Sequence, residues 1–293
     1  MPLITLNGAE LYYEEHGEGD EVVISSANGF HPTYPASLAQ APTNYKVYTL
    51  QTLGFGRSAR LDTAPPQGYL NRWAEDVIAL ADHLGVDKFS YTGISHGGGI
   101  GWVIAHRFPQ RLKALLSVVG TPHLRYGVTD SSEGRRKIVD NPGNSDVIRE
   151  AMMQMAGPTP EGREELRDAV LELALATKLD RDPNEARINQ GMPFPEAKDN
   201  DALRTVLSSI DVPVLILGGM RDGVIPPGSS VLAGAAVRRA KTVLFEDEGH
   251  WIAKESPERL VREIKLFMDE LDGTALPPRN EALSLAGGEA GTV

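Results

Sequence analysis

Residues 93–97 have the sequence Gly-Ile-Ser-His-Gly, which matches the pattern G-x-S-x-G. A strand-like run, Lys88 to Thr92, precedes this segment, and a glycine-rich helical run, Gly97 to Arg107, follows it. A sharp turn from strand to helix projects the serine hydroxyl outward, and the start of a helix supplies backbone N–H groups near a developing negative charge. We therefore predict that Ser95 is an attacking nucleophile.

A serine hydroxyl is a weak nucleophile at neutral pH and needs a neighbouring base. His250, in Glu-Gly-His-Trp, comes shortly after the strand-like run Thr242 to Phe245. Asp222 follows the apolar run Val212 to Leu217. Because the carboxyl ends of parallel strands meet at one edge of a sheet, we expect these side chains to lie near Ser95. We predict that His250 is the base and that Asp222 orients it.

Stabilisation of an oxyanion requires two N–H donors. One is expected to be the amide of His96, directly after the nucleophile, and the other the amide of Phe30, in the Asn-Gly-Phe-His segment at residues 28–31. Further candidates for substrate contact are Gly29, His31, Met152, Met153 and Trp251. Together with Met155 the two methionines form a cluster at near-helical spacing, so they either line an apolar pocket or fill a core.

The elements that position these residues alternate along the chain. Four strand-like runs come first, then a helical run from Trp73 to Leu84 with apolar residues at helical spacing. Strands alternate with helices again from Lys88 to Val119, and a final helix is expected to open at Ser256. This alternation predicts a parallel sheet covered by helices on both faces.

Residues 121–209 interrupt the alternation and have a mainly helical pattern. Within them, Thr159-Pro160 is expected to start a helix with Leu166, Val170, Leu173 and Thr177 on one face. We predict a core domain over residues 1–120 and 210–272, an inserted helical lid over residues 121–209, and a disordered tail over residues 273–293.

Composition narrows the classes of partner. The 293 residues carry a formal net charge of −11, which disfavours nucleic acid and anionic membrane surfaces as partners. The absence of cysteine excludes disulfides, thiolate metal sites and cysteine nucleophiles. Neither a signal peptide nor an apolar run long enough to span a membrane is visible, so we expect a cytoplasmic protein. The expected partner is a small-molecule substrate, and homo-oligomer formation stays open.

With Ser95, Asp222 and His250 in this order, the chain resembles the α/β-hydrolase fold proteins that carry a lid. Three further segments add to the resemblance: Leu-Gly-Phe-Gly-Arg-Ser at residues 53–58, Phe-Pro-Gln-Arg-Leu at 108–112, and Pro-Val-Leu-Ile-Leu-Gly at 213–218. The resemblance implies a mostly parallel eight-stranded sheet with flanking helices and an inserted helical lid.

Two positions depart from the family pattern, and both normally tie loops together through hydrogen bonds. Asn28-Gly29 replaces the usual His-Gly pair, and Gln51 replaces the usual aspartate. Asparagine and glutamine can also form such hydrogen bonds, while the geometry of the loops and the substrate preference stay open.

The resemblance implies acyl transfer to water without a metal or an organic cofactor. A carboxylic ester or a lactone is the expected substrate. Hydrolysis of a C–C bond or an amide by the same three residues is an alternative. A non-catalytic ligand receptor on the same fold is an alternative of another class.

Overall fold

The computed structural model of the chain describes residues 3–29, 34–61, 68–125, 133–179, 185, 188 and 190–273. Among the helices in these ranges, none combines the length and the apolar character needed to cross a membrane.

Eight strands form one sheet in the order β1-β2-β4-β3-β5-β6-β7-β8. Their bounds are β1 (Leu3–Leu6), β2 (Ala9–His16), β3 (Val22–Ala27), β4 (Lys46–Gln51), β5 (Phe89–Ile94), β6 (Leu112–Val118), β7 (Val214–Gly219) and β8 (Ala240–Phe245). The pairs β1–β2 and β2–β4 are antiparallel, and the remaining pairs are parallel. This architecture confirms the predicted mostly parallel eight-stranded sheet.

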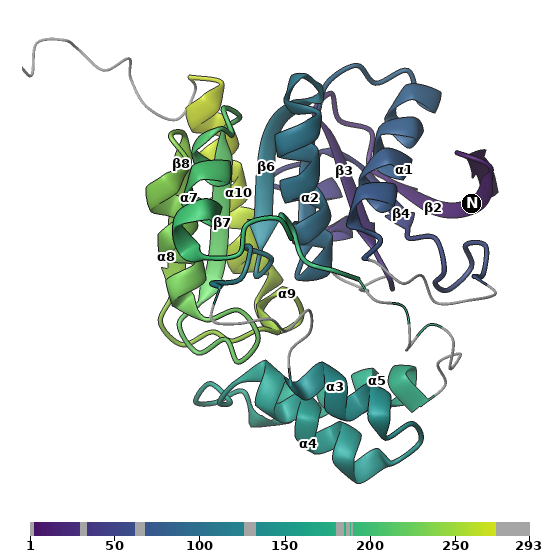
Figure 1. Cartoon of the computed structure of the whole chain (residues 1–293), viewed down its shortest axis with the longest axis vertical. Helices are drawn as coiled ribbons and strands as arrows, with labels where there is room; N and C mark the ends of the chain where they lie inside the picture. The colour runs from purple at the N-terminus through teal and green to yellow at the C-terminus, as the bar shows by residue number, and fades with distance from the viewer. Residues whose placement is uncertain are drawn as a thin grey trace, which may run out of the picture.

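Helices cover both faces of this sheet and also extend beyond one of its edges (Figure 1). Their bounds are α1 (Leu70–His83), α2 (His96–Arg107), α3 (Glu133–Asp140), α4 (Ser145–Ala156), α5 (Glu164–Leu179), α7 (Asn200–Ser208), α8 (Pro227–Ala236), α9 (Ile252–Glu255) and α10 (Pro257–Leu271). Two short 3₁₀ helices, η1 (Ala36–Ala39) and η2 (Pro109–Arg111), complete the described elements.

The strands bury both of their faces, and β7 shows how. Val214 and Ile216 face the apolar cluster shared with α1, α2, α7 and α8. Leu215 and Leu217 face the opposite cluster, which η1, α9 and α10 complete. Successive side chains of a strand point to opposite faces, so a strand covered on both sides reads as a continuous apolar run.

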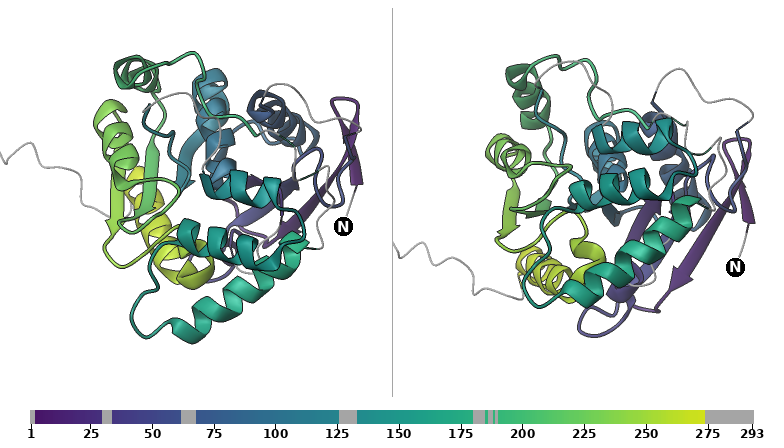
Figure 2. Two further views of the ribbon diagram at one scale, coloured as in Figure 1. Left: turned by 60° about the horizontal axis from the view of Figure 1, so that its bottom comes forward. Right: turned by 90° about the horizontal axis from the view of Figure 1, so that it is seen from below.

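Helices α3, α4 and α5, which we call the helical layer, follow β6 in the chain and precede β7. Figure 1 shows them grouped apart from the helices that flank the sheet, and in the right view of Figure 2, from below, they lie in front of the sheet. The layer has its own apolar cluster, which includes Met152 and Leu171 and is joined by Trp251 from the segment after β8. By contrast, Leu203 and Leu207 of α7 belong to the core cluster on the sheet.

Two expectations for α5 were wrong. The helix begins at Glu164, after a turn, and not at Thr159-Pro160. Leu166 and Leu173 are exposed instead of sharing the buried face. That face consists of Arg167, Val170, Leu171, Ala174 and Leu175. The inward face therefore lies about one position further along the helix than Leu166 and Leu173 indicate, and it includes a buried arginine.

Candidate active site

Ser95 lies at the turn between β5 and α2, where its backbone has φ 54° and ψ −117°. L-residues rarely adopt a positive φ, so the surroundings must hold this turn in place. A Cβ at Gly93 would collide with the backbone of Gly97, and a Cβ at Gly98 would come within 2.7 Å of the Cα of Gly120. Glycine at these positions lets the chain pack closely enough to maintain the strained turn.

Asp222, His250 and Ser95 form a continuous run of hydrogen bonds. Nδ1 of His250 lies 2.9 Å from Oδ2 of Asp222, and Nε2 lies 3.0 Å from Oγ of Ser95. Oδ1 of Asp222 also accepts from the amides of Val224 and Ile225, at 2.7 and 2.8 Å. With Nδ1–H donating to the carboxylate, Nε2 is left to accept the serine proton. The structure therefore brings together three residues that are far apart in the sequence.

Of the two amides expected to face an oxyanion, the structure describes that of His96 but not that of Phe30. His96 is the first residue of α2, and a backbone N–H there can be directed at a negative charge. Phe30 lies outside the described residues. The side chain of His96 accepts a hydrogen bond at Nε2 from the amide of Asn28, at 3.1 Å. Its ring also packs edge-on against Trp73, so the imidazole supports the loop after β3.

The two departures from the family pattern preserve the ties between loops. Nε2 of Gln51 donates to the carbonyl oxygen of Asn28 at 3.3 Å, and its Oε1 accepts from the amide of Arg57 at 2.5 Å. Oδ1 of Asn28 accepts from the hydroxyl of Thr52 at 2.8 Å. Amide side chains at these two positions therefore still join the loops that follow β3 and β4.

The candidates for substrate contact fall into three groups. His31 lies outside the described residues, and Gly29 is exposed with open space around its Cα. Met152 and Trp251 are buried in the cluster of the helical layer, and Met153 is half-buried against the same cluster. Packing in this cluster is enough to explain why Met152 and Trp251 are buried. Contact of these residues with a substrate therefore stays a prediction.

His123 is a further titratable group near the triad, and the sequence interpretation did not single it out. It follows β6 at the carboxyl edge of the sheet and is half-buried. Burial lowers its pKa, electrostatic interactions with His250 and Arg125 lower it further, and the charge of Asp222 opposes them. The signal available in the sequence is its place after a predicted strand, in Thr-Pro-His.

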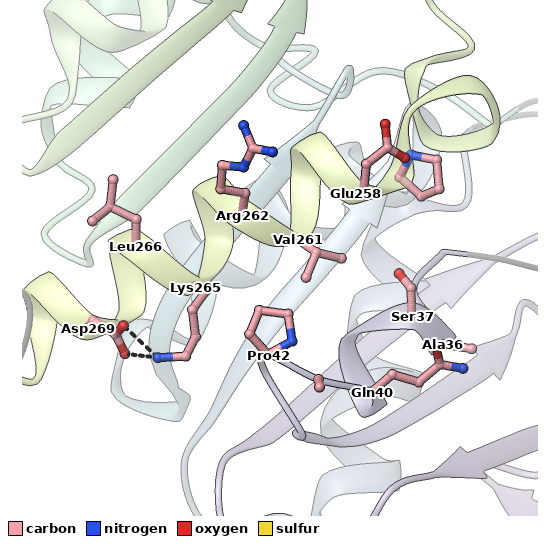
Figure 3. A pocket seen from close by; sticks show the side chains of 12 residues that line it. Ala36, Ser37, Gln40, Pro42, Glu258, Val261, Arg262, Lys265, Leu266 and Asp269 are labelled. Atoms are coloured by element: carbon pink, nitrogen blue, oxygen red, sulfur yellow. Dashed lines mark hydrogen bonds and ion pairs between the residues drawn. The ribbon is translucent and has the colours of Figure 1, made fainter.

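A surface cavity of about 740 Å³ lies elsewhere, between η1 and α10. Figure 3 shows Pro42 and Val261 on facing sides of it, and the ion pair between Lys265 and Asp269 at one end. None of its lining residues is a candidate site residue, so this cavity plays no part in the catalytic proposal.

Comparison with known proteins gives a consistent family. The sequence profile of the alpha/beta hydrolase fold matches residues 15–257. A 2-hydroxymuconate semialdehyde hydrolase from Pseudomonas putida is 25% identical over 267 residues, and the match covers 88% of this chain and 90% of that protein.

A 3-oxoadipate enol-lactonase from Acinetobacter baylyi is 25% identical, and the match covers 75% of this chain and 79% of that protein. A thermophilic esterase from Thermogutta terrifontis shares the fold, with a TM-score of 0.73 and 22% identity over 92% of this chain and 97% of its own. These proteins act on different substrates, so the comparisons leave the substrate of this chain open.

Proposed function

Because the chain belongs to the α/β-hydrolase fold family, we propose that it hydrolyses a carboxylic ester or a lactone through an acyl-enzyme on Ser95. The observation that carries the proposal is the run of hydrogen bonds from Asp222 through His250 to the Ser95 hydroxyl. A serine with this partner, at a turn that points its hydroxyl away from the sheet, has the geometry of an activated nucleophile.

The chemistry proceeds in two stages. Ser95 Oγ attacks the carbonyl carbon as Nε2 of His250 takes the hydroxyl proton. We expect the resulting oxyanion to accept from the amide of His96 and, as the sequence predicts, from that of Phe30. When the C–O bond breaks, His250 returns that proton to the leaving alkoxide. A water then attacks the acyl carbon and gives a proton to His250. When the bond from the acyl carbon to Oγ of Ser95 breaks, His250 returns that proton to Oγ, and the free acid leaves. Asp222 holds the imidazole in the required tautomer throughout.

We further propose that the helical layer acts as a lid over this site. The end of α4 contacts the loops that carry Asp222 and His250, since the carbonyl oxygen of Ala156 accepts from the amide of His250 at 3.0 Å. A layer in this position would shield the acyl-enzyme from bulk water and shape the pocket for the acyl or alcohol part.

Hydrolysis of a C–C bond is the second candidate, and the similarity to the 2-hydroxymuconate semialdehyde hydrolase favours it. The same three residues would serve, with a carbon leaving group in place of an alkoxide. Parallel assays of a p-nitrophenyl ester, a lactone and a vinylogous diketo acid separate the two candidates, because the preferred substrate has the highest kcat/KM.

The first test compares the wild-type protein with Ser95→Ala in hydrolysis of a short-chain p-nitrophenyl ester. We expect Ser95→Ala to lower kcat on the order of 10⁴-fold or more, because no other group replaces the nucleophile. Ser208→Ala is the matched control, because Ser208 is an exposed serine on α7. It should retain wild-type kcat.

Labelling with a fluorophosphonate supplies a second measurement that does not depend on the choice of substrate. The reagent should modify Ser95 in the wild-type protein and fail to modify Ser95→Ala. If the wild-type protein hydrolyses none of the substrate panel and Ser95 stays unlabelled, the hydrolase proposal is wrong and the ligand-receptor alternative gains support.

A further inference from the structure

The end of helix α4 packs directly on the two loops that carry the acid and the base. The carbonyl oxygen of Ala156 accepts a hydrogen bond from the amide of His250. A Cβ at Gly249 would collide with that same carbonyl oxygen, and a Cβ at Gly223 would collide with the carbonyl oxygen of Gln154. No side chain separates the backbone of α4 from these loops, so a displacement of α4 would move them.

A buried arginine fixes this end of α4. The side chain of Arg167, on α5, is 1% exposed and forms a two-pronged ion pair with Glu255 of α9, whose side chain is fully buried. Nη1 of Arg167 donates to the carbonyl oxygen of Gly157 at 2.7 Å, and Nη2 reaches that of Pro158 at 3.5 Å. The planar guanidinium thus binds a carboxylate and the chain that continues from α4 at the same time.

The groups that Arg167 binds are both linked to the backbone of His250. Glu255 follows it by five residues, and Gly157 is the direct neighbour of the residue that accepts its amide proton. The ring of Trp251, next to His250, lies 5.4 Å from the guanidinium carbon of Arg167. The side chain of Arg167 therefore connects the end of α4, which accepts from the His250 amide, to Glu255, which follows His250 in the chain.

A second buried carboxylate holds the other end of the same loop. Oε1 of Glu248 accepts from Arg163 of the chain leading into α5, at 2.7 Å, and from Arg259 of α10, at 2.6 Å. Its side chain is fully buried. The two arginines are partly exposed, but the carboxylate is not, so a departure from this geometry would leave a buried charge without a partner.

We propose that Arg167 is a positioning residue for His250. Its ion pair with Glu255 and its bonds to the end of α4 set the distance from Nε2 of His250 to Ser95. The inference rests on the proposed hydrolase function, in which that distance determines how well the serine proton is transferred. Arg167 itself touches neither Ser95 nor the imidazole ring in the contacts that the structure describes.

The test separates positioning from stability with three variants. Arg167→Met removes the charge and leaves Glu255 buried without a partner, so it should also lower the melting temperature. The double variant Arg167→Met/Glu255→Met replaces the pair with apolar groups of similar length and should regain stability. Arg149→Met is the matched control, because Arg149 pairs with Glu172 across the same helices α4 and α5 at an exposed position.

Two measurements report on the position of His250. One is the downfield proton resonance of the Nδ1–H hydrogen bond to Asp222, which requires no turnover, and the other is kcat and KM with the preferred ester. We expect the double variant to have a wild-type melting temperature, a displaced resonance, and a kcat lowered about tenfold to a hundredfold. Its KM should stay within about twofold of the wild-type value. Arg149→Met should change none of these.

A double variant with wild-type resonance and wild-type kcat would overturn the proposal, since the pair would then serve stability alone. The resonance still decides the matter if Arg167→Met does not fold. A wild-type protein without turnover or Ser95 labelling would refute the hydrolase function, while the resonance of the variants would still show whether Arg167 positions the imidazole.

Discussion

At the scale of single residues, the carboxylate of Asp222 has its orientation fixed before any substrate binds. Two backbone amides and one imidazole nitrogen approach its two oxygens. A side chain held in this way keeps the imidazole of His250 in one orientation, which avoids rearrangement during the reaction. The Asp-Gly pair in the sequence also fits an ordinary solvated turn, so only its place after a strand pointed to this role.

The imidazole of His123 stays neutral at pH values where a solvated histidine takes up a proton. Burial is the main reason for its lowered pKa, followed by electrostatic interactions with His250 and Arg125. A neutral group at this place adds no positive charge beside the base. The sequence could indicate that a loop ends at this edge of the sheet, but not that the loop buries its histidine.

Replacement of His123 by glutamine should make the stability of the protein less sensitive to acid. As the pH falls below about 6.5, the unfolded chain binds a proton at position 123 before the folded chain does, so folding loses free energy. One such proton accounts for at most about 1.4 kcal/mol per pH unit. Urea unfolding between pH 7 and pH 5 should therefore show a shallower decline for His123→Gln than for the wild-type protein.

His83→Gln serves as the comparison, because His83 is exposed on α1. Its unfolding free energy should follow the wild-type pH dependence. Equal slopes for His123→Gln and the wild-type protein would contradict the assignment of His123 as a buried neutral imidazole.

At the scale of elements, the sequence predicted the sheet and the turn at Ser95 more accurately than it predicted α5. The sequence predicted a strand within the apolar run Val212 to Leu217, and β7 spans Val214–Gly219. The two agree closely because a strand that is covered on both faces reads as a continuous apolar run. Val170, Leu171, Ala174 and Leu175 of the buried face are apolar at helical spacing, but apolar spacing gives no sign of Arg167, which is buried in an ion pair with Glu255. That partner lies 88 residues away, beyond the reach of any local pattern.

The contact between α4 and the loop that carries Asp222, which we call the acid loop, gives a prediction of its own. Gly157 and Gly143 flank α4 and have positive φ values of 85° and 80°. Alanine at either position is strained by roughly 1–3 kcal/mol, but only at Gly157 would its Cβ collide with a neighbour, the carbonyl oxygen of Arg221. Gly157→Ala should lose more unfolding free energy than Gly143→Ala, as measured in urea, and it alone should lower kcat. Equal losses for the two variants would show that α4 does not rest on the acid loop.

At the scale of the whole molecule, three apolar clusters account for the described structure. Two lie on the faces of the sheet, and the third lies within the helical layer. Helix α10 completes the cluster on one sheet face with residues near its end, including Phe267 and Met268. The sequence predicted this helix from its apolar stripe and predicted that the core ends at residue 272.

Truncation of the chain tests where the folded unit ends. A chain that stops at residue 273 keeps every residue of the three clusters, so we expect its melting temperature and kcat/KM to equal those of the full chain. A chain that stops at residue 266 loses the buried Phe267 and Met268, which together stabilise the fold by about 3–6 kcal/mol. Since a domain of this kind is stable by only about 5–15 kcal/mol, the shorter chain should melt at a much lower temperature or fail to fold. Calorimetry of the two truncations next to the full chain makes the comparison, and a large loss for the longer one would mean that residues 274–293 contribute to the fold.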